Sequence, residues 1–311
     1  MMSRLGRRSS VRLRSRPDVA MPRLTVIMPA WNAESTISAA LRSTLVAMPT
    51  DAEILVYDDA STDGTRRLVQ RFADRTSRVS LIEGPLNVGA GEARNQLIAR
   101  SDSEFVAAMD ADDICLPHRF VGYRRSMSKS DLLFAPIARF AQGARVHIPR
   151  PAPLSPGAMP VALLVLNPVP QSTMIARRVS LGGVGTYRPG HAEDYELWMR
   201  LAASGARISL TSFPTVAYRH HPNQATSQPG YEQQVRENEA LIESYNALAA
   251  AVLGIDARNT STQELRSELQ RSVEQVESSR DRTHLRRLLR SRWSLPLRAS
   301  GGVPSQESDD Q

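Results

Sequence analysis

The chain has 311 residues, a single cysteine and a formal net charge of +7, a length that allows one large domain with an appendage. The lone cysteine, Cys115, excludes an internal disulfide and is typical of a reducing compartment. No apolar run approaches the roughly 20 residues of a membrane-spanning helix. Outside two arginine-rich ends, residues 1–20 (net +5) and 280–298 (net +6), the net charge is −4, and aromatic residues make up 5% of the chain. This composition argues against a nucleic-acid-binding protein, because such proteins present a basic surface and aromatic rings for base stacking.

Four apolar runs in the first 110 residues are separated by helical patterns. They predict buried strands at residues 24–28, 54–57, 79–82 and 105–108. Strands and helices that alternate in this way are typical of a parallel α/β sheet with right-handed crossovers. Ligands of such sheets bind outside the carboxyl ends of the strands. We therefore expect one site, formed by the loops that follow Met28, Tyr57, Ile82 and Met109.

Two of these loops are rich in aspartate. Asp58 and Asp59 follow the second strand, and Asp110, Asp112 and Asp113 follow the fourth. Crowded carboxylates repel one another and cost stability unless a cation or a ligand compensates their charge. Hard oxygen ligands suit Mg²⁺ or Mn²⁺, and Mg²⁺ usually binds one or two carboxylates together with substrate phosphates. The alternative is a solvated acidic turn, since aspartate is common in turns.

Four motifs in this half resemble, in the same order, those of the inverting family 2 glycosyltransferases. They are Thr25-Val-Ile-Met-Pro-Ala-Trp-Asn-Ala, Val56-Tyr-Asp-Asp-Ala-Ser-Thr-Asp-Gly-Thr, Asn87-Val-Gly-Ala-Gly-Glu-Ala-Arg-Asn and Met109-Asp-Ala-Asp-Asp. The resemblance covers about residues 23–222. It implies the GT-A fold, an α/β, Rossmann-like nucleotide-binding domain with a mostly parallel central sheet, here followed by a helical C-terminal extension.

The resemblance implies donor-side roles for individual residues. Contacts with the nucleotide base and ribose are expected from Ala30, Trp31, Asn32, Glu34 and Asp59. Arg94 is expected near the diphosphate or bracing the acidic loop. Asp110 and Asp112 match an Asp-x-Asp motif, in which Asp112 ligates the metal and Asp110 holds the ribose or a metal-bound water. Asp113 is expected to face the donor sugar.

The second half of the resemblance implies the acceptor side. Residues 171–178 resemble the strand that lines it, and Glu193-Asp-Tyr-Glu-Leu-Trp-Met-Arg-Leu resembles the Glu-Asp motif that opens a helix below the acceptor. Asp194 is the expected general base, since proton abstraction requires a carboxylate that faces the site. Glu193 and Trp198 are expected on the acceptor side. The alternative is structural, because acids also favour helix N-termini through the helix dipole.

A closing loop, Tyr218-Arg-His-His-Pro-Asn-Gln-Ala-Thr-Ser, completes the match. Arg219 is expected at the diphosphate or the donor sugar and His221 at the metal or diphosphate, the alternative being a surface or structural histidine. The implied reaction is inverting attack of an acceptor hydroxyl on a nucleotide-sugar, with Mg²⁺ or Mn²⁺ stabilising the leaving diphosphate. A UDP-sugar is the favoured donor. The implied acceptor is a sugar, a lipid-linked or a small molecule, in cell-surface polysaccharide or glycoconjugate synthesis.

Two other functions compete with this one. A nucleotidyltransferase on a similar fold predicts a glycine-rich phosphate loop with a basic residue after the first strand, and Trp31-Asn-Ala-Glu is not such a loop. A nucleic-acid-binding protein would rely on the arginine-rich ends, and the acidic remainder opposes it, so no nucleic-acid partner is expected. The sequence also lacks a Gln-x-x-Arg-Trp motif, which argues against a processive synthase.

The ends differ in character from the middle of the chain. Four segments are predicted: a disordered basic tail (residues 1–21), the GT-A domain (22–227), a helical extension (228–298) and a disordered tail (299–311). For the first segment, translation from Met21 is an alternative. Two helices are expected in the extension, at residues 231–253 and 260–289.

The segment 285–297 is basic and amphipathic, with Leu285, Leu289 and Trp293 among arginines. It fits the surface of an anionic membrane or, as an alternative, a helix that packs on the domain. The expected location is the cytoplasm, with peripheral contact at the inner face of the plasma membrane.

Overall fold

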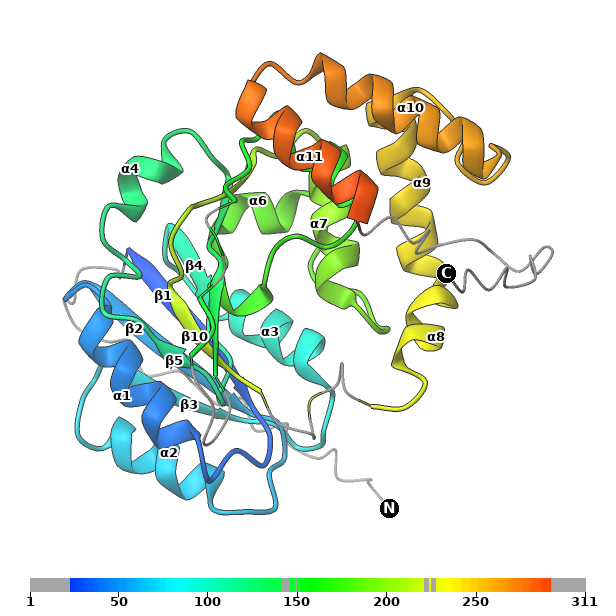
Figure 1. Cartoon of the computed structure of the whole chain (residues 1–311). Coiled ribbons are helices and arrows are strands. Elements are labelled where there is room, and N and C mark those ends of the chain that lie inside the picture. The colour runs from blue at the N-terminus through cyan, green and yellow to red at the C-terminus, as the bar shows by residue number, and fades with distance from the viewer. Residues whose placement is uncertain are drawn as a thin grey trace, which may run out of the picture.

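The computed structural model describes residues 23–140, 146–148, 150, 152–220, 224 and 228–291. Its centre is a seven-stranded sheet in the order β3-β2-β1-β4-β8-β6-β9, with helices packed around it (Figure 1). The predicted tails at residues 1–21 and 299–311 lie outside the described residues, and so does His221.

The N-terminal half builds four neighbouring strands that run parallel. These are β1 (Leu24–Ala30), β2 (Ala52–Asp58), β3 (Val79–Glu83) and β4 (Phe105–Ala108). β1 lies between β2 and β4, with Leu24 opposite Ala52 on one side and Phe105 on the other. The crossovers contain α1 (Ile37–Ala47), α2 (Thr65–Ala73) and α3 (Ala90–Ala99). The predicted alternation of strands and helices, and the parallel sheet, are confirmed.

The side chains of β1 contribute to two cores, because successive residues of a strand point to opposite faces of a sheet. Val26 and Met28 belong to one core together with Leu41 of α1 and Val69 of α2. Ile27 belongs to the other, which includes residues of α3 and of the C-terminal helices. The sheet is therefore covered on both faces, and its carboxyl edge stays available for a site.

The strand direction changes after β4. β8 (Ile175–Arg177) pairs antiparallel with β4 and with β6 (Leu132–Phe134), and β9 (Ile208–Leu210) pairs parallel with β6. A second sheet holds three short strands, β5 (Ile114–Cys115), β10 (Val216–Arg219) and β7 (Ile137–Phe140). Because β10 pairs with β5, directly after the acidic loop, it brings Arg219 to that loop. The helices of this region are α4 (Tyr123–Met127), α5 (Met159–Leu163), η1 (Gln171–Thr173), α6 (Arg178–Gly183) and α7 (Glu193–Ala203).

The C-terminal helices pack on the domain and share its core. They are α8 (Tyr231–Arg236), α9 (Glu239–Leu253), α10 (Thr262–Gln275) and α11 (Ser279–Ser291). Their buried residues Leu241, Leu265 and Leu285 join the same hydrophobic cluster as Leu163 of α5 and Leu197 of α7. The predicted helical C-terminal region is confirmed, whereas its separation as a domain at residue 227 stays a prediction.

Each of the two helices predicted in this region is interrupted. At the first break the Asn238 side chain accepts a hydrogen bond from Leu241 N at 3.3 Å and donates one to His191 O at 2.7 Å. It therefore starts α9 as an N-cap and ties it to the loop before α7. At the second break the Arg282 guanidinium donates to the carbonyls of Val276 and Glu277, which no longer continue the helix.

The structure supports packing, rather than membrane insertion, for the leucines of α11. Leu285 is fully buried and Leu289 is 6% exposed, both within the core that includes α5 and α10. The prediction that these leucines enter a membrane surface is therefore wrong, because protein already covers them. Trp293 lies outside the described residues. Within the described ranges, no helix combines the length and the apolar character that crossing a bilayer requires.

Replacing Leu285 by alanine tests whether α11 is integral to the fold. A leucine removed from a closed core leaves a cavity, so we expect Leu285→Ala to lower the free energy of unfolding by about 2–5 kcal/mol. Val121→Ala is the control, since Val121 is 79% exposed and its loss should change the free energy by less than about 0.5 kcal/mol. Urea denaturation measures both. Equal stability of the two variants would show that α11 contributes little.

Candidate functional site

Hydrogen bonds join the loops at the carboxyl edge of the sheet. The loop after β1 is bound to the loop after β2, since Asn32 Oδ1 accepts from Thr62 N at 2.9 Å and Glu34 Oε2 accepts from Gly64 N at 3.0 Å. In return, Asp63 Oδ2 accepts from Glu34 N at 3.0 Å. Asn32 adopts a left-handed backbone with φ of 48°, a conformation that costs energy for a non-glycine residue and is common at functional sites.

The other residues predicted to contact the nucleotide base and ribose differ in exposure. Trp31 is 58% exposed and Ala30 is buried at the end of β1. Asp59 is buried, and its two oxygens accept from Val88 N at 2.8 Å and Gly89 N at 2.9 Å. Asp59 therefore fixes the loop that leads into α3, whereas the indole of Trp31 is open to a ligand.

Arg94 joins the two halves of the candidate site. Its buried guanidinium donates to Asp110 Oδ1 at 2.9 Å and to Glu193 Oε1 at 3.1 Å, and it lies 5.6 Å from the centre of the Tyr187 ring. Burial alone would lower the pKa of Arg94, but Asp110, Tyr187 and Glu193 together raise it above its usual range. Arg94 therefore braces the acidic loop, and its predicted place near the diphosphate stays a prediction.

The acidic loop is bound to β10. Asp113 Oδ1 accepts from Arg219 N and the carbonyl of Asp112 accepts from Arg219 Nε, both at 2.9 Å. The guanidinium of Arg219 lies 4.7 Å from the centre of the Phe140 ring. Burial, followed by the charges of Asp110 and Asp112, raises the pKa of Asp113 to about 8. Because Asp113 has no exposed surface, the predicted contact with a donor sugar is not available to it in this conformation.

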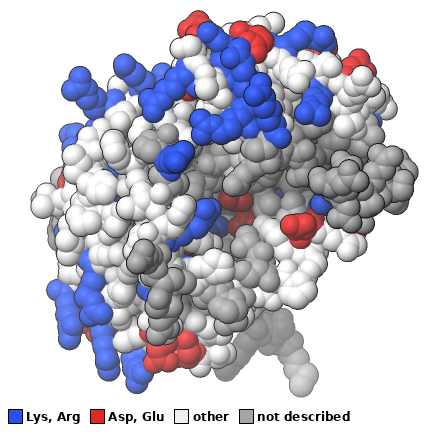
Figure 2. All heavy atoms as spheres, in the orientation of Figure 1, with Lys and Arg blue, Asp and Glu red and all other residues white. Residues whose placement is uncertain are grey.

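Asp194 lies in the first turn of α7, next to the residue that pairs with Arg94. Its carboxylate accepts from Tyr195 N at 2.7 Å and from Asn167 Nδ2 at 3.3 Å. Burial, followed by the charge of Glu193, raises the pKa of Asp194 to about 6. The chain enters this helix through Ala192, whose φ of 58° is a third left-handed non-glycine conformation besides those of Asn32 and Ala60. In Figure 2 a hollow near the centre of the face has acidic side chains at its base.

Trp198 does not reach the acceptor side, and that prediction is wrong. Its side chain is fully buried and packs edge-on against Phe134 at 4.8 Å and Tyr187 at 6.3 Å between ring centres. Trp198 lies on the inward face of α7, where the helix needs apolar side chains. Glu193, by contrast, lies at the site and pairs with Arg94.

A buried polar network behind α7 was missed by sequence reasoning. Glu196 is 1% exposed, pairs with Arg200 through two bonds of 2.8 Å and accepts from Ser244 Oγ of α9 at 2.8 Å. Arg188 adds an ion pair at 3.4 Å. Arg200 also donates to the carbonyl of Thr186 at 2.8 Å. The network therefore holds the loop before Asp194 and α9 together, and its one sequence signal is the Glu–Arg spacing of four on a helix.

Tyr187 is a second residue that sequence reasoning missed. Its backbone N–H and carbonyl are bound by the Asn95 side chain of α3, each at 2.9 Å, and its hydroxyl accepts from Gln171 Nε2 at 2.8 Å. These bonds hold the Tyr187 ring in place against the guanidinium of Arg94. The pair is 92 positions apart in sequence, so no local pattern could reveal it.

The carboxylate oxygens at the acidic loop fit a divalent cation that also binds a diphosphate. Within the described ranges, no group of three or more His, Cys, Asp or Glu side chains is arranged to hold a metal ion. The carboxylates of Asp110 and half-exposed Asp112 lie at this loop, and one or two carboxylates suffice when phosphates supply further ligands. Burial and the charges of Asp110 and Asp112 disfavour a further anion here, as the raised pKa of Asp113 shows, and a cation would relieve that cost.

Comparison with known proteins finds similarity to one glycosyltransferase family. Residues 25–150 match the model of glycosyl transferase family 2. Succinoglycan biosynthesis protein ExoU of Rhizobium meliloti is 32% identical over 207 residues, which are 60% of this chain and 58% of ExoU. The glucosyltransferase WfgD of Escherichia coli is 37% identical over 111 residues, 36% of this chain and 43% of WfgD. The chain thus spans about half the length of these relatives.

Solved structures show the same fold. TarS of S. aureus, solved with UDP-GlcNAc, superposes with a TM-score of 0.56 at 18% identity, covering 86% of this chain and 91% of that one. A mannosyltransferase of Pyrobaculum calidifontis, solved with GDP-Man and Mn²⁺, gives a TM-score of 0.50 at 18% identity, with coverages of 87% and 85%. The predicted GT-A fold is confirmed.

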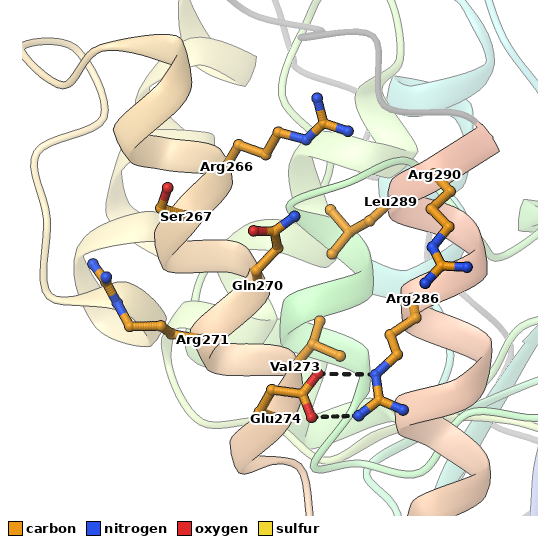
Figure 3. A pocket seen from close by; sticks show the side chains of 9 residues that line it. All are labelled: Arg266, Ser267, Gln270, Arg271, Val273, Glu274, Arg286, Leu289 and Arg290. Carbon is orange, nitrogen blue, oxygen red and sulfur yellow. Dashed lines mark hydrogen bonds and ion pairs between the residues drawn. The ribbon is translucent and has the colours of Figure 1, made fainter.

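The network behind α7 can be tested by removing its charge. Glu196→Gln leaves two arginines without their buried carboxylate, and we expect the free energy of unfolding to fall by about 3–5 kcal/mol. The matched control is Glu274→Gln, because Glu274 also binds an arginine through two bonds, to Arg286 (Figure 3), but its side chain is 56% exposed. Exposed pairs contribute little, so a loss in the control as large as in Glu196→Gln would contradict the role of burial.

Proposed function

We propose that the protein transfers a sugar from a nucleotide-sugar to an acceptor hydroxyl with inversion of the anomeric centre. The observation that carries the proposal is the bridge from Asp110 through Arg94 to Glu193, because it sets the acidic loop beside a carboxylate, Asp194, whose pKa is raised to about 6. A donor-side acidic loop and a base tuned towards neutrality are the two parts that such a transfer requires.

The donor is proposed to lie on the loops after β1 and β2. Trp31 is the exposed aromatic of this wall, and Asn32, Glu34 and Asp59 shape it through the hydrogen bonds described above. A UDP-sugar is favoured, because the name of the E. coli relative specifies UDP-Glc and TarS was solved with UDP-GlcNAc. The mannosyltransferase with GDP-Man shows that the fold also accepts another base.

The diphosphate is proposed to lie at the acidic loop, with Mg²⁺ or Mn²⁺ held by Asp112 and aided by Asp110. When bound, such an ion would neutralise the charge that develops on the leaving diphosphate. Arg219 contributes a second positive charge from β10, fixed to this loop by its bond to the carbonyl of Asp112. His221, which lies outside the described residues, is proposed as a further ligand.

Asp194 is proposed to take the proton of the acceptor hydroxyl. With a pKa of about 6 it is mainly ionised at neutral pH, yet basic enough to accept a proton as the bond forms. Its hydrogen bonds from Tyr195 N and Asn167 Nδ2 hold the carboxylate in one orientation. Glu193, oriented by Arg94, is proposed to line the acceptor side next to it.

The acceptor is proposed to be a lipid-linked sugar in the synthesis of a cell-surface polysaccharide. The names of two E. coli relatives specify a GlcNAc-diphosphoundecaprenol acceptor, and ExoU is named for succinoglycan biosynthesis. Such an acceptor lies in a membrane, so the protein is proposed to work in the cytoplasm at the inner face of the plasma membrane.

Asp194→Asn tests the base. We expect donor binding to be kept and the transfer rate to fall by roughly two to four orders of magnitude. In the unaltered protein the rate should fall as the pH drops below about 6, because protonation of Asp194 removes the base, and it should level off above that pH. Asp102→Asn, at an exposed residue before β4, serves as the control and should keep both rate and profile. An Asp194→Asn variant with the normal rate would exclude the assignment.

Asp112→Asn tests the metal site through binding alone. Thermal denaturation of the unaltered protein should show that a nucleoside diphosphate stabilises it more with Mn²⁺ than without, since any ligand of the native state raises its stability. The variant should lose the Mn²⁺-dependent part and keep the rest. Asp102→Asn is the control, because Asp102 is exposed and precedes β4 at the opposite edge of the sheet. Retention of the full Mn²⁺ effect in Asp112→Asn would refute the role of Asp112.

A further inference from the structure

An aromatic pair connects the loop before α7 with the first residue of α8. The rings of His191 and Tyr231 meet edge-on, with 5.7 Å between their centres and 89° between their planes. His191 is exposed, Tyr231 is partly exposed, and His191 stands three positions before Asp194 in the chain. The pair therefore presents aromatic surface to solvent close to the candidate base.

The phenol of Tyr231 lies within the electrostatic influence of the two carboxylates at the start of α7. Burial, followed by the charges of Asp194 and Glu193, raises the pKa of Tyr231 to about 12. A charge acts more strongly on a neighbouring group the closer it lies, so this shift agrees with the ring contact in placing Tyr231 beside the base. At neutral pH the hydroxyl keeps its proton and can donate a hydrogen bond.

A hydrogen bond and a close backbone approach hold the loop of His191 against the start of α9, the helix into which α8 leads (Figure 1). The Asn238 side chain caps α9 and donates to the carbonyl of His191 at 2.7 Å. Gly190 has a φ of 133°, and a Cβ at this position would come within 2.7 Å of Asn238 Nδ2. The loop thus needs glycine to approach α9 this closely, and the approach fixes His191 relative to α8.

An open groove of about 640 Å³ lies at α8, and Tyr231 is part of its lining. The other lining residues are Gln228, Gly230, Glu232, Gln233 and Arg236. The size is within the usual range of small-molecule sites, about 300–1,000 Å³. None of the six residues of α8 is buried, so its side chains contribute little to the core and remain available to a ligand.

The groups around this groove suit a sugar. The C–H groups on one face of a pyranose ring carry partial positive charge, which matches the negative face of an aromatic ring. Sugar hydroxyls both donate and accept hydrogen bonds. Glu232 and Arg236 form only a long, exposed ion pair of 3.9 Å, and such a pair contributes little, so both groups can turn to ligand hydroxyls.

We propose that Tyr231 and His191 form one wall of the acceptor subsite, where they hold the pyranose ring of a sugar acceptor so that one of its hydroxyls faces Asp194. The polar side chains of α8 bind further hydroxyls of the same acceptor. Tyr231 orients the acceptor and takes no part in the proton transfer, because its hydroxyl stays protonated. The proposal rests on the proposed function, since Asp194 acts there as the base.

The test measures acceptor binding separately from transfer. The probe is N-acetylglucosamine diphosphate with a short alkyl chain, after the acceptor in the names of two E. coli relatives. Isothermal titration calorimetry in the presence of UDP and Mn²⁺ gives its affinity. We expect Tyr231→Ala to bind the probe roughly ten- to hundredfold more weakly, because a ring contact and a hydrogen bond are lost. Tyr231→Phe keeps the ring and should lose roughly two- to fivefold.

Phe213→Ala is the matched control, because it removes an exposed aromatic ring away from the acidic loop. Phe213 is 69% exposed and precedes β10, whose opposite end carries Arg219, so this variant should bind the probe normally. An equal loss in Phe213→Ala, or an unchanged affinity in Tyr231→Ala, would overturn the proposal. An alkyl diphosphate without a sugar that competes as well as the probe would do the same, because the phosphate and not the ring would then be bound.

UDP binding keeps this proposal separate from the proposed function. Thermal denaturation with and without UDP and Mn²⁺ should give the same shift for Tyr231→Ala and the unaltered protein, and it also shows that the variant folds. If Tyr231→Ala does not fold, His191→Ala takes its place and should likewise weaken probe binding. An unaltered protein that binds UDP but not the probe would refute the acceptor wall and leave the donor site intact. Binding of the probe that depends on Tyr231, without binding of UDP or GDP, would refute the transferase and leave a sugar-binding wall.

Discussion

The ion pairs of Arg94 with Asp110 and Glu193 are the interaction on which the candidate site depends. A guanidinium is costly to bury, and the pair energies offset that cost only when geometry and hydrogen bonding are good. Here two carboxylates at 2.9 and 3.1 Å and the Tyr187 ring surround it. Because the partners come from α3, the end of β4 and the start of α7, one side chain fixes the distance between the acidic loop and the helix of Asp194.

The same arrangement sets the electrostatics of the site. Asp194 is disfavoured as an anion by burial and by Glu193, and favoured by its hydrogen bond from Tyr195 N and by Arg94, so its pKa settles at about 6. Burial, followed by the charges of Asp110 and Asp112, raises the pKa of Asp113 to about 8. The two carboxylates thus differ in proton affinity because each has its own set of neighbouring charges and hydrogen bonds.

The C-terminal helices support this site from behind and give the molecule a second chemical surface. Ser244 of α9 donates to Glu196, which through Arg200 holds the loop before Asp194. The buried leucines of α11 complete the core, and its arginines face outward. The buried face of these helices therefore stabilises the domain that carries Asp194, whereas the exposed face of α11 presents positive charge.

The sequence by itself determined the order of strands and helices, the parallel half of the sheet and the edge where the acidic loops meet, because hydrophobic periodicity and turn residues are local signals. The resemblance of the Glu193-Asp194 stretch to a family motif also singled out Asp194, while the local pattern alone left a helix N-terminus as the alternative. Only the tertiary structure decided which partner each polar group takes: Arg94 with Glu193, 99 positions away, and Asp59 with the backbone of Val88 and Gly89. It also decided that Trp198 and the leucines of α11 are core residues, because an apolar stripe looks the same whether protein, acceptor or membrane covers it.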